Sequence, residues 1–405
     1  MPSPEIRKHF ARIALQFLAE VSPGTKEYRA ASTGLMPIEV SLGQEIDDPF
    51  CPVVWKPGEE RNGFFLILGA SGSGKTEALK LISNQIIDHG VPVLVLDFHG
   101  DLGVSWIHPI IMSSGYDSVV GINPMELDSH RAHEVGLYDQ RIALIDMISR
   151  AIPDISHNQR VMLSDAMEAA YRWVGIYDDD PISWERSPPT FSTVISILQM
   201  WLSDDSLKGR RPTINGCLSA IKVVFGHPIF DRCMNLSVDE ILSLGARVDL
   251  SRIPNGIRYI VADTLLRKVF RALTLQGHIP VNPADDSERF KLFIIVDEAK
   301  VLTKSKGIPN ASDLILNILA TEGRKFGIGL ILASQMSDHF GDELKASISA
   351  RLVMKPLDVG QAKKNALDVQ VLPESLLSLA GMGAGYFRSQ HHGGARKVKI
   401  QRIGE

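Results

Sequence analysis

The chain has 405 residues, of which 44% are hydrophobic and 22% are charged, and its formal net charge is −4. These values are ordinary for a globular protein with one large or two smaller domains. The slightly acidic charge excludes nucleic-acid binding through overall positive charge, so any DNA site has to be a local basic patch.

The cysteines and the hydropathy indicate a cellular compartment. Cys51, Cys217 and Cys233 lie far apart and have no metal-ligand spacing, which is typical of a reducing cytoplasm. No apolar run approaches the ~20 residues that a membrane span needs, and the N-terminus has no signal-peptide core. We therefore expect a cytoplasmic protein with no membrane partner.

Residues 1–60 are expected to form an N-terminal arm. Apolar spacing predicts an amphipathic helix over 6–20, and short strands are expected near 38–42 and 52–56. Residues 61–125 then begin the main α/β core with a strand at 64–68, a helix at 77–89 and a strand at 92–97. A strand–helix–strand run of this kind is one unit of a parallel sheet.

Residues 126–245 are predicted to be a helical insertion, with helices at 130–152, 157–174, 191–202 and 213–230. Residues 246–405 return to the core. Their expected elements are strands at 247–250, 292–296, 328–335 and 351–355, helices at 259–276, 314–326 and 342–350, and closing β segments at 385–388 and 397–401. The fold class is therefore α/β.

The loop between strand 64–68 and helix 77–89 fits the phosphate-binding pattern G-x-x-x-x-G-K-[ST] at every fixed position. Its residues are Gly69, Ala70, Ser71, Gly72, Ser73, Gly74, Lys75 and Thr76, and Glu77 follows as the first helical residue. Such a loop places backbone N–H groups and a helix N-terminus around a polyphosphate. We expect Lys75 to reach the β- and γ-phosphates of ATP and the Thr76 hydroxyl to ligate Mg²⁺.

The buried strand 292–296 ends in Asp297 and Glu298, at the edge where open α/β sheets bind ligands. We expect Asp297 to orient the Mg²⁺ shell and Glu298 to accept a proton from the attacking water. Gln335 ends the strand 328–335, where a neutral amide suits a water-positioning and γ-phosphate-sensing role. This set of residues predicts ATP hydrolysis.

Two arginines are candidates for stabilising transition-state charge. Arg324 lies near the end of helix 314–326 and is expected to be a finger that points into a neighbouring subunit. The alternative is a solvated helix end. Arg351 opens the strand 351–355 and is the alternative finger or sensor.

Local basic residues are candidates for DNA contact. Lys304 and Lys306 lie in a polar loop directly after the Asp–Glu strand, and Arg210 and Arg211 lie in the helical insertion. A solvated surface loop is the alternative in both places. His99 and Asp101, after strand 92–97, either couple the nucleotide site to a partner or form a simple turn.

The order of these motifs resembles the HerA/FtsK superfamily, and its HerA branch most of all. The resemblance rests on six segments: GASGSGKT at 69–76, VLVLDFHGDL at 93–102, RVDLSRI at 247–253, FIIVDEA at 293–299, EGRKFGIGLILASQ at 322–335 and GAGYFRS at 383–389. It implies a RecA-like P-loop NTPase core, Mg²⁺ and ATP as cofactors, and finger and sensor roles for Arg324 and Gln335. It also implies a homohexameric ring that pumps duplex DNA.

The sequence thus favours a ring-shaped DNA translocase that works beside a nuclease or NAD-hydrolase-type effector, since no second catalytic motif accompanies the P-loop. A conjugation or packaging motor is the alternative within the class. A nucleotide-gated scaffold that assembles an effector enzyme, for example in antiviral defence, is the alternative outside it.

Overall fold

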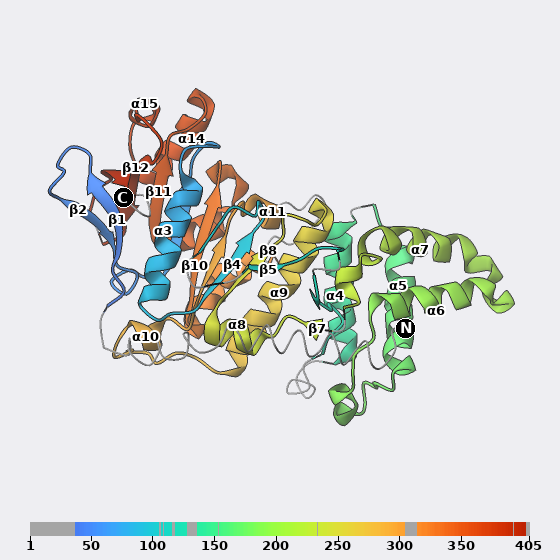
Figure 1. The fold of residues 1–405 in the computed structure, drawn as a ribbon. Helices are drawn as coiled ribbons and strands as arrows, with labels where there is room; N and C mark the ends of the chain where they lie inside the picture. Colours follow the sequence, from blue (N-terminus) through green and yellow to red (C-terminus); the bar gives the residue numbers. More distant parts are fainter. Residues whose placement is uncertain are drawn as a thin grey trace.

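The computed structural model describes residues 37–104, 107, 109–115, 118–127, 136–152, 154–232, 234–303, 314–391 and 393–401. The helix expected over 6–20 lies outside these residues. Within them, an 11-stranded sheet with the order β2-β1-β13-β12-β11-β3-β10-β9-β4-β8-β5 runs through the core (Figure 1).

The sheet has a parallel part and an antiparallel part. The parallel strands are β3 (Phe64–Leu68), β4 (Val93–Asp97), β5 (Pro109–Ile111), β8 (Ala246–Asp249), β9 (Leu292–Val296), β10 (Ile328–Ser334) and β11 (Ala350–Met354). The strands β12 (Ala384–Ser389), β13 (Arg396–Ile400), β1 (Val40–Glu45) and β2 (Pro52–Trp55) extend it in antiparallel fashion. The central strands β3, β4, β9 and β10 are buried along their whole length, as their unbroken apolar sequences predict.

Helices cover both faces of the sheet. Because side chains alternate along a strand, Phe65 and Ile67 of β3 pack in the layer of α3 (Lys75–Asp88). Phe64 and Leu66 pack on the other face, in the layer of α9 (Asn255–Leu275). The shorter helices are α8 (Val238–Leu244), α10 (Asp286–Arg289), α11 (Lys300–Thr303), α12 (Ile315–Glu322), α13 (Asp342–Ser347), α14 (Val359–Val369) and α15 (Pro373–Leu377).

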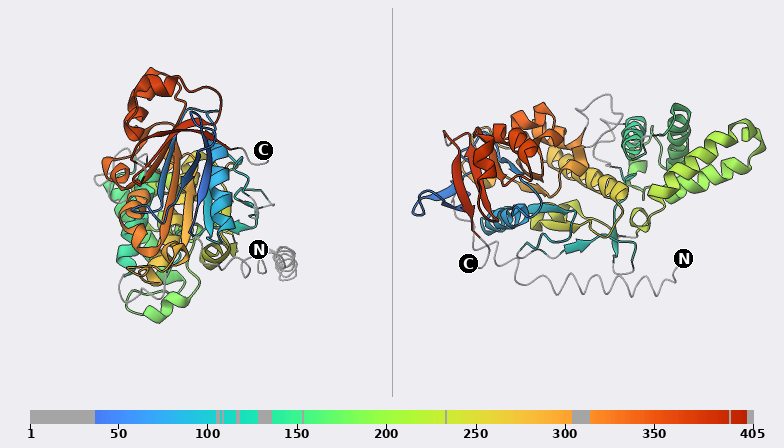
Figure 2. Two further views of the ribbon diagram at one scale, coloured as in Figure 1. Left: turned by 90° about the vertical axis from the view of Figure 1, so that its left-hand side faces the viewer. Right: turned by 90° about the horizontal axis from the view of Figure 1, so that it is seen from above.

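The predicted helical stretch is confirmed as four helices that project to one side of the sheet (Figure 2). They are α4 (Leu137–Ala151), α5 (His157–Trp173), α6 (Phe191–Ser203) and α7 (Arg211–Phe225). Phe191 and Phe225 stack with ring centroids 3.7 Å apart and join α6 to α7. The short parallel strands β6 (Val120–Gly121) and β7 (Met234–Asn235) pair where the chain enters and leaves this stretch. The division of the chain at residues 126 and 245 stays a prediction.

No helix within the described residues is both long and apolar enough to cross a lipid bilayer.

Candidate active site

The loop between β3 and α3 has the backbone of a phosphate cradle. Gly72 and Gly74 have φ angles of 74° and 108°, in the left-handed region that glycine tolerates best. A Cβ on Gly74 would lie 3.0 Å from the backbone nitrogen of Gly383, so this position leaves little room for a side chain. Gly74 is also the N-cap of α3, and no side chain caps that N-terminus. The first N–H groups of α3 are therefore free to face an anion.

Lys75, the first residue of α3, lies inside this loop. Its ammonium donates hydrogen bonds to the carbonyl oxygens of Gly69 at 2.9 Å and Ala70 at 2.8 Å. Burial lowers the pKa of Lys75, and the nearby carboxylates of Glu298 and Asp297 oppose that shift. The loop thus holds the lysine, and the carboxylates that follow β9 stabilise its positive charge.

Asp297, directly after β9, suits a divalent cation. Its side chain is buried, and its Oδ2 has no hydrogen-bond partner among the described residues. Burial raises the pKa of Asp297 to about 6; Asp101, Asp97 and Glu298 add to the rise, and His99 opposes it. A buried carboxylate oxygen without a donor is stabilised by a hard cation, so the residue fits Mg²⁺.

Glu298 is held in an unusual backbone conformation beside Asp297. Its φ is 59°, in the left-handed region that costs a non-glycine residue about 1–3 kcal/mol. Its carboxylate pairs with the ammonium of Lys300, and His99 Nε2 lies 3.7 Å from Oε2. Such strain persists where the surrounding structure fixes it, and the carboxylate here lies beside His99 of the loop that follows β4.

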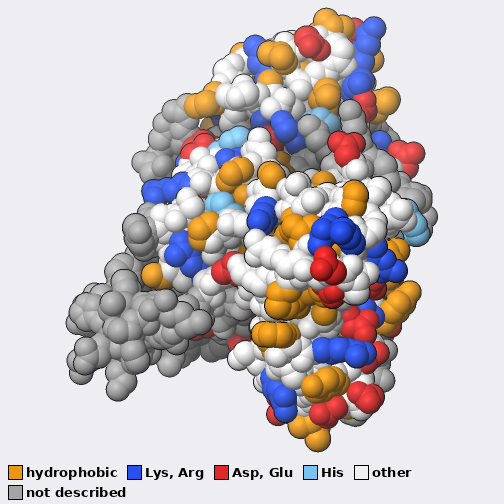
Figure 3. Space-filling model, turned by 90° about the vertical axis from the view of Figure 1, so that its right-hand side faces the viewer, with side chains coloured by type: hydrophobic (Ala, Val, Ile, Leu, Met, Phe, Trp, Pro, Cys, Tyr) orange, Lys and Arg blue, Asp and Glu red, His pale blue; other side chains and the backbone are white. Residues whose placement is uncertain are grey.

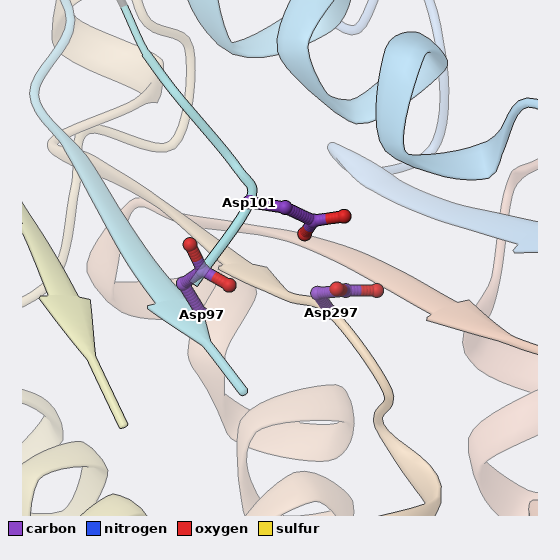
Figure 4. Close-up of side chains that lie close together, drawn as sticks. All are labelled: Asp97, Asp101 and Asp297. Atoms are coloured by element: carbon purple, nitrogen blue, oxygen red, sulfur yellow. The ribbon is translucent and has the colours of Figure 1, made fainter. Parts of the chain in front are cut away.

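Asp97, Asp101 and Asp297 bring carboxylate oxygens within 4.8 Å of one another where β4 and β9 end (Figure 4). Asp97 is already satisfied. The guanidinium of Arg247 donates to its Oδ2 from Nε at 3.0 Å and from Nη2 at 2.7 Å. Three backbone N–H groups of the following turn also donate to this carboxylate, those of His99, Gly100 and Leu102. Asp97 therefore anchors the turn that carries His99 and Asp101.

One cleft of about 1080 Å³ gathers most of the predicted site. The predicted residues among its lining are Ser71, Gly72, Gly74, Lys75, Thr76, Glu77, His99, Asp101, Asp297, Glu298 and Gln335. Gln335 enters because β10 lies between β3 and β9, so that all three strands end at the same edge. The structure thus brings the lysine, both acids and the amide to one place.

Arg324 lies elsewhere. It is exposed in the short 3₁₀ turn η6 (Gly323–Phe326), which precedes β10, whereas Gln335 follows the same strand. Because β10 and β3 are parallel, Arg324 is at the sheet edge opposite the phosphate loop of its own chain.

Arg351, near the start of β11, is engaged in structural contacts. Its guanidinium donates to the carbonyl oxygens of Ile348 at 3.0 Å and Lys345 at 2.6 Å. Its Nε lies 3.4 Å from Oδ1 of Asp368. The finger and sensor roles of Arg324 and Arg351 stay predictions.

The structure describes two of the four predicted DNA-contact residues. Lys304 and Lys306 are outside the described residues. Arg210 ends the 3₁₀ helix η3 (Asp205–Arg210) and Arg211 begins α7, where it pairs with Asp205 at 3.1 Å. On the face that carries these helices, basic and acidic side chains are intermixed (Figure 3).

Sequence reasoning did not find the helical wall of the cleft. Arg150 at the end of α4 and Asn255 and Tyr259 in the first turns of α9 line it, opposite the phosphate loop. Burial raises the pKa of Tyr259 to about 12, with Asp263 adding to the rise and Arg150 opposing it. Arg150 could have been noticed as the basic residue in the last turn of a predicted helix, but nothing in its spacing points to the cleft.

Comparison with known proteins supports the motif assignment. Residues 64–184 match the family model described as "Helicase HerA, central domain". The chain is 26% identical over 318 residues to the "DNA import protein CedB" of Sulfolobus acidocaldarius, with 75% of this chain and 45% of that protein covered. It is 22% identical over 356 residues to the "DNA double-strand break repair helicase HerA" of Pyrococcus furiosus, with 79% and 61% covered. In sequence the chain is thus similar to P-loop ATPases of the HerA/FtsK superfamily.

Solved structures show the same fold. The VirB4 structure of Thermoanaerobacter pseudethanolicus superimposes with a TM-score of 0.65 at 17% identity, covering 90% of this chain and 96% of that one. The plasmid coupling protein TrwB in complex with ADP and Mg²⁺ gives a TM-score of 0.55 at 14% identity, covering 84% and 86%. The chain spans about half the length of the curated relatives it matches.

Proposed function

We propose that this chain hydrolyses Mg²⁺-ATP and uses the energy to move duplex DNA through a ring of six copies. The observation that carries the proposal is the single cleft in which Lys75, Asp297, Glu298 and Gln335 meet beside an uncapped helix N-terminus. Each residue type at that cleft has a role in phosphoryl transfer.

The phosphate loop binds the nucleotide through its N–H groups, and Lys75 neutralises charge on the β- and γ-phosphates. Thr76 and the unpartnered oxygen of Asp297 hold Mg²⁺, which when bound offsets charge on the phosphates. Glu298 accepts a proton from the attacking water, and Gln335 orients that water. The TrwB structure with ADP and Mg²⁺, which has the same fold, supports this choice of ligand.

The position of Arg324 supports an assembly in which neighbouring copies share a site. An exposed arginine at the sheet edge opposite its own phosphate loop cannot stabilise transition-state charge in its own chain. In a closed head-to-tail ring, that edge of one copy faces the cleft of the next. Arg324 is then a finger supplied in trans.

The names of the relatives support DNA as the substrate, since one is a DNA import protein and the other a DNA repair helicase. Lys304 and Lys306, outside the described residues, and Arg210 and Arg211 are the proposed DNA contacts. The ring works in the cytoplasm beside a nuclease or NAD-hydrolase-type effector. The sparse, widely spaced cysteines support the compartment, and the lack of a second catalytic motif in the sequence supports a separate effector.

Two variants test the nucleotide site. Lys75→Ala should lose Mg²⁺-ATP binding, whereas Glu298→Gln should keep binding and lose turnover, because only the proton acceptor is removed. Binding is measured with a fluorescent ATP analogue, and turnover by phosphate release. Near-wild-type hydrolysis in both variants would reject the site.

The shared site is tested by mixing. Rings made from Arg324→Ala and Lys75→Ala copies should regain activity, because some interfaces then hold both an intact finger and an intact phosphate loop. A mass that stays monomeric with ATP, or no recovery at any mixing ratio, contradicts the assembly.

The role of DNA is tested by measuring hydrolysis with and without duplex DNA and the dependence of DNA binding on salt concentration. Hydrolysis should rise with duplex DNA, and binding should weaken steeply as salt increases. A Lys304→Ala/Lys306→Ala variant should flatten that dependence and leave DNA-independent hydrolysis unchanged; Arg210→Ala/Arg211→Ala provides the comparison. Hydrolysis indifferent to DNA would favour the nucleotide-gated scaffold instead.

A further inference from the structure

Helix α14 presents a buried polar face to the residues that follow β10. Gln361, Asn365 and Asp368 recur at a spacing that places them on one side of a helix. Gln361 is 7% exposed and Asn365 is fully buried. Buried amides persist in a fold only where their hydrogen bonds are made, so their partners indicate what the face holds.

Both side-chain amides donate a hydrogen bond to the same carbonyl oxygen. The main-chain carbonyl oxygen of Gln335 accepts a hydrogen bond from Gln361 Nε2 at 2.9 Å and another from Asn365 Nδ2 at 3.1 Å. Two buried donors on one carbonyl fix its direction more firmly than the single ladder bond of a strand.

The oxygen atoms of both side-chain amides also accept hydrogen bonds. Asn365 Oδ1 accepts the backbone N–H of Ser337 at 3.2 Å, and Gln361 Oε1 accepts that of Leu357. Because oxygen and nitrogen each have a partner of the correct kind, the orientation of both amides is determined. Asn365 therefore clamps the backbone on both sides of Met336, directly after the residue that enters the cleft.

The same helix contacts the second arginine candidate. Asp368, one turn beyond Asn365, lies 3.4 Å from the guanidinium of Arg351 on β11. One helical face thus joins the end of β10 to β11, the strand on the other side of β3.

We propose that Asn365 and Gln361 are positioning residues for hydrolysis: they fix the backbone of Gln335 so that its side chain reaches the attacking water. The inference rests on the proposed role of Gln335 in ATP hydrolysis. The position of Gln335 matters for the rate, because displacing a catalytic group by about 1 Å costs on the order of 10²-fold in turnover.

The test uses Asn365→Asp in the full chain. The substitution keeps the shape and the acceptor for Ser337, but it turns the donor that faces the Gln335 carbonyl into a second acceptor. The expected result is a kcat at least tenfold lower, with KM and the Kd for Mg²⁺-ADP within about twofold of wild type, since the phosphate loop is untouched. Lys363→Ala, on the exposed side of the same helix, is the matched control and should change neither constant.

A double-mutant cycle separates positioning from simple stability. Gln335→Ala keeps the clamped carbonyl but removes the amide that it positions. Asn365→Asp should therefore lower kcat no further in the Gln335→Ala background. An equal loss in both backgrounds means that Asn365 acts only on stability, and it overturns the proposal.

Two outcomes distinguish this proposal from the function on which it rests. Near-wild-type kcat in Gln335→Ala shows that the residue has no role in hydrolysis, and both ideas then fail at that residue. Low kcat in Gln335→Ala with normal kcat in Asn365→Asp rejects the positioning role alone. If Asn365→Asp does not fold, Gln361→Glu, which leaves the Asn365 clamp in place, is measured in the same cycle with the same expected results.

Discussion

Replacing Asp97 by alanine should destabilise the protein by leaving Arg247 buried without its partner. Arg247 is 8% exposed and gives two hydrogen bonds to the Asp97 carboxylate. Removing one member of a buried ion pair costs about 3–5 kcal/mol, because the remaining charge stays desolvated. The backbone N–H groups of His99, Gly100 and Leu102 lose an acceptor as well, which adds to the cost.

The size of the effect follows from the length of the chain. An unfolding entropy of about 2.1 cal/mol/K per residue gives roughly 0.85 kcal/mol/K for a cooperative melt of 405 residues. A loss of about 3–5 kcal/mol then lowers Tm by about 4–6 °C. Thermal unfolding followed by circular dichroism without nucleotide measures this shift.

Two controls make the reasoning refutable. Asp101→Ala, an exposed acid on the same turn, should leave Tm within about a degree of wild type. Asp97→Ala/Arg247→Met should melt above Asp97→Ala, because the orphaned charge is gone. Either of two results would show that the pair does not hold this turn. One is an Asp97→Ala variant that melts like wild type, and the other is a double variant that melts below Asp97→Ala.

Three further predictions concern the cleft and the sheet. Lys300→Met should raise DNA-independent kcat several-fold, because the Glu298 carboxylate loses its ion pair; an unchanged or lower kcat would show that the pair does not restrain it. Gly329→Ala places a Cβ 2.2 Å from the ring of Phe293 on β9 and should cost about 1–3 kcal/mol in a denaturant melt. Gly103→Ala, in a loop and with nothing within 4 Å of the added Cβ, is the neutral control. Folding raises the pKa of Asp297 from 3.8 to about 6, so between these two pH values the folded chain holds a proton that the unfolded chain has lost. The free energy of unfolding without Mg²⁺ therefore falls as the pH rises toward 6. Mg²⁺ binds the deprotonated carboxylate, so Mg²⁺-dependent ADP binding should strengthen between pH 5 and 7. An ADP affinity that does not change with pH would contradict the assignment of Asp297 to the metal site.

The phosphate loop, the acidic strand end and the parallel core could be predicted because each has a local sequence signal. An unbroken apolar run marks β9, and glycines at fixed spacing mark the loop after β3. The helices of the insertion were also predictable from apolar periodicity; α5, for example, was expected at 157–174 and spans His157–Trp173.

Helix α14 had no such signal. Its buried face is built from Gln361, Ala362, Asn365, Ala366 and Val369, so no broad apolar stripe appears in the sequence. Amides become core residues only when a carbonyl from another segment meets them, and that pairing is a tertiary fact. The helical wall around Arg150 and Tyr259 was missed for the same reason, because residues more than a hundred positions apart meet only in the fold.

The ends of the central sheet limit how copies of this chain can associate. In the described part of the chain, the outermost strands are β2 with four residues and β5 with three, and each begins with a proline that has no N–H to offer. Neither provides the row of unpaired donors and acceptors on which a foreign strand could lengthen the sheet. Among the described residues, any contact between copies is therefore expected to use helix surfaces and connecting turns, which can separate and rejoin without breaking a β-ladder.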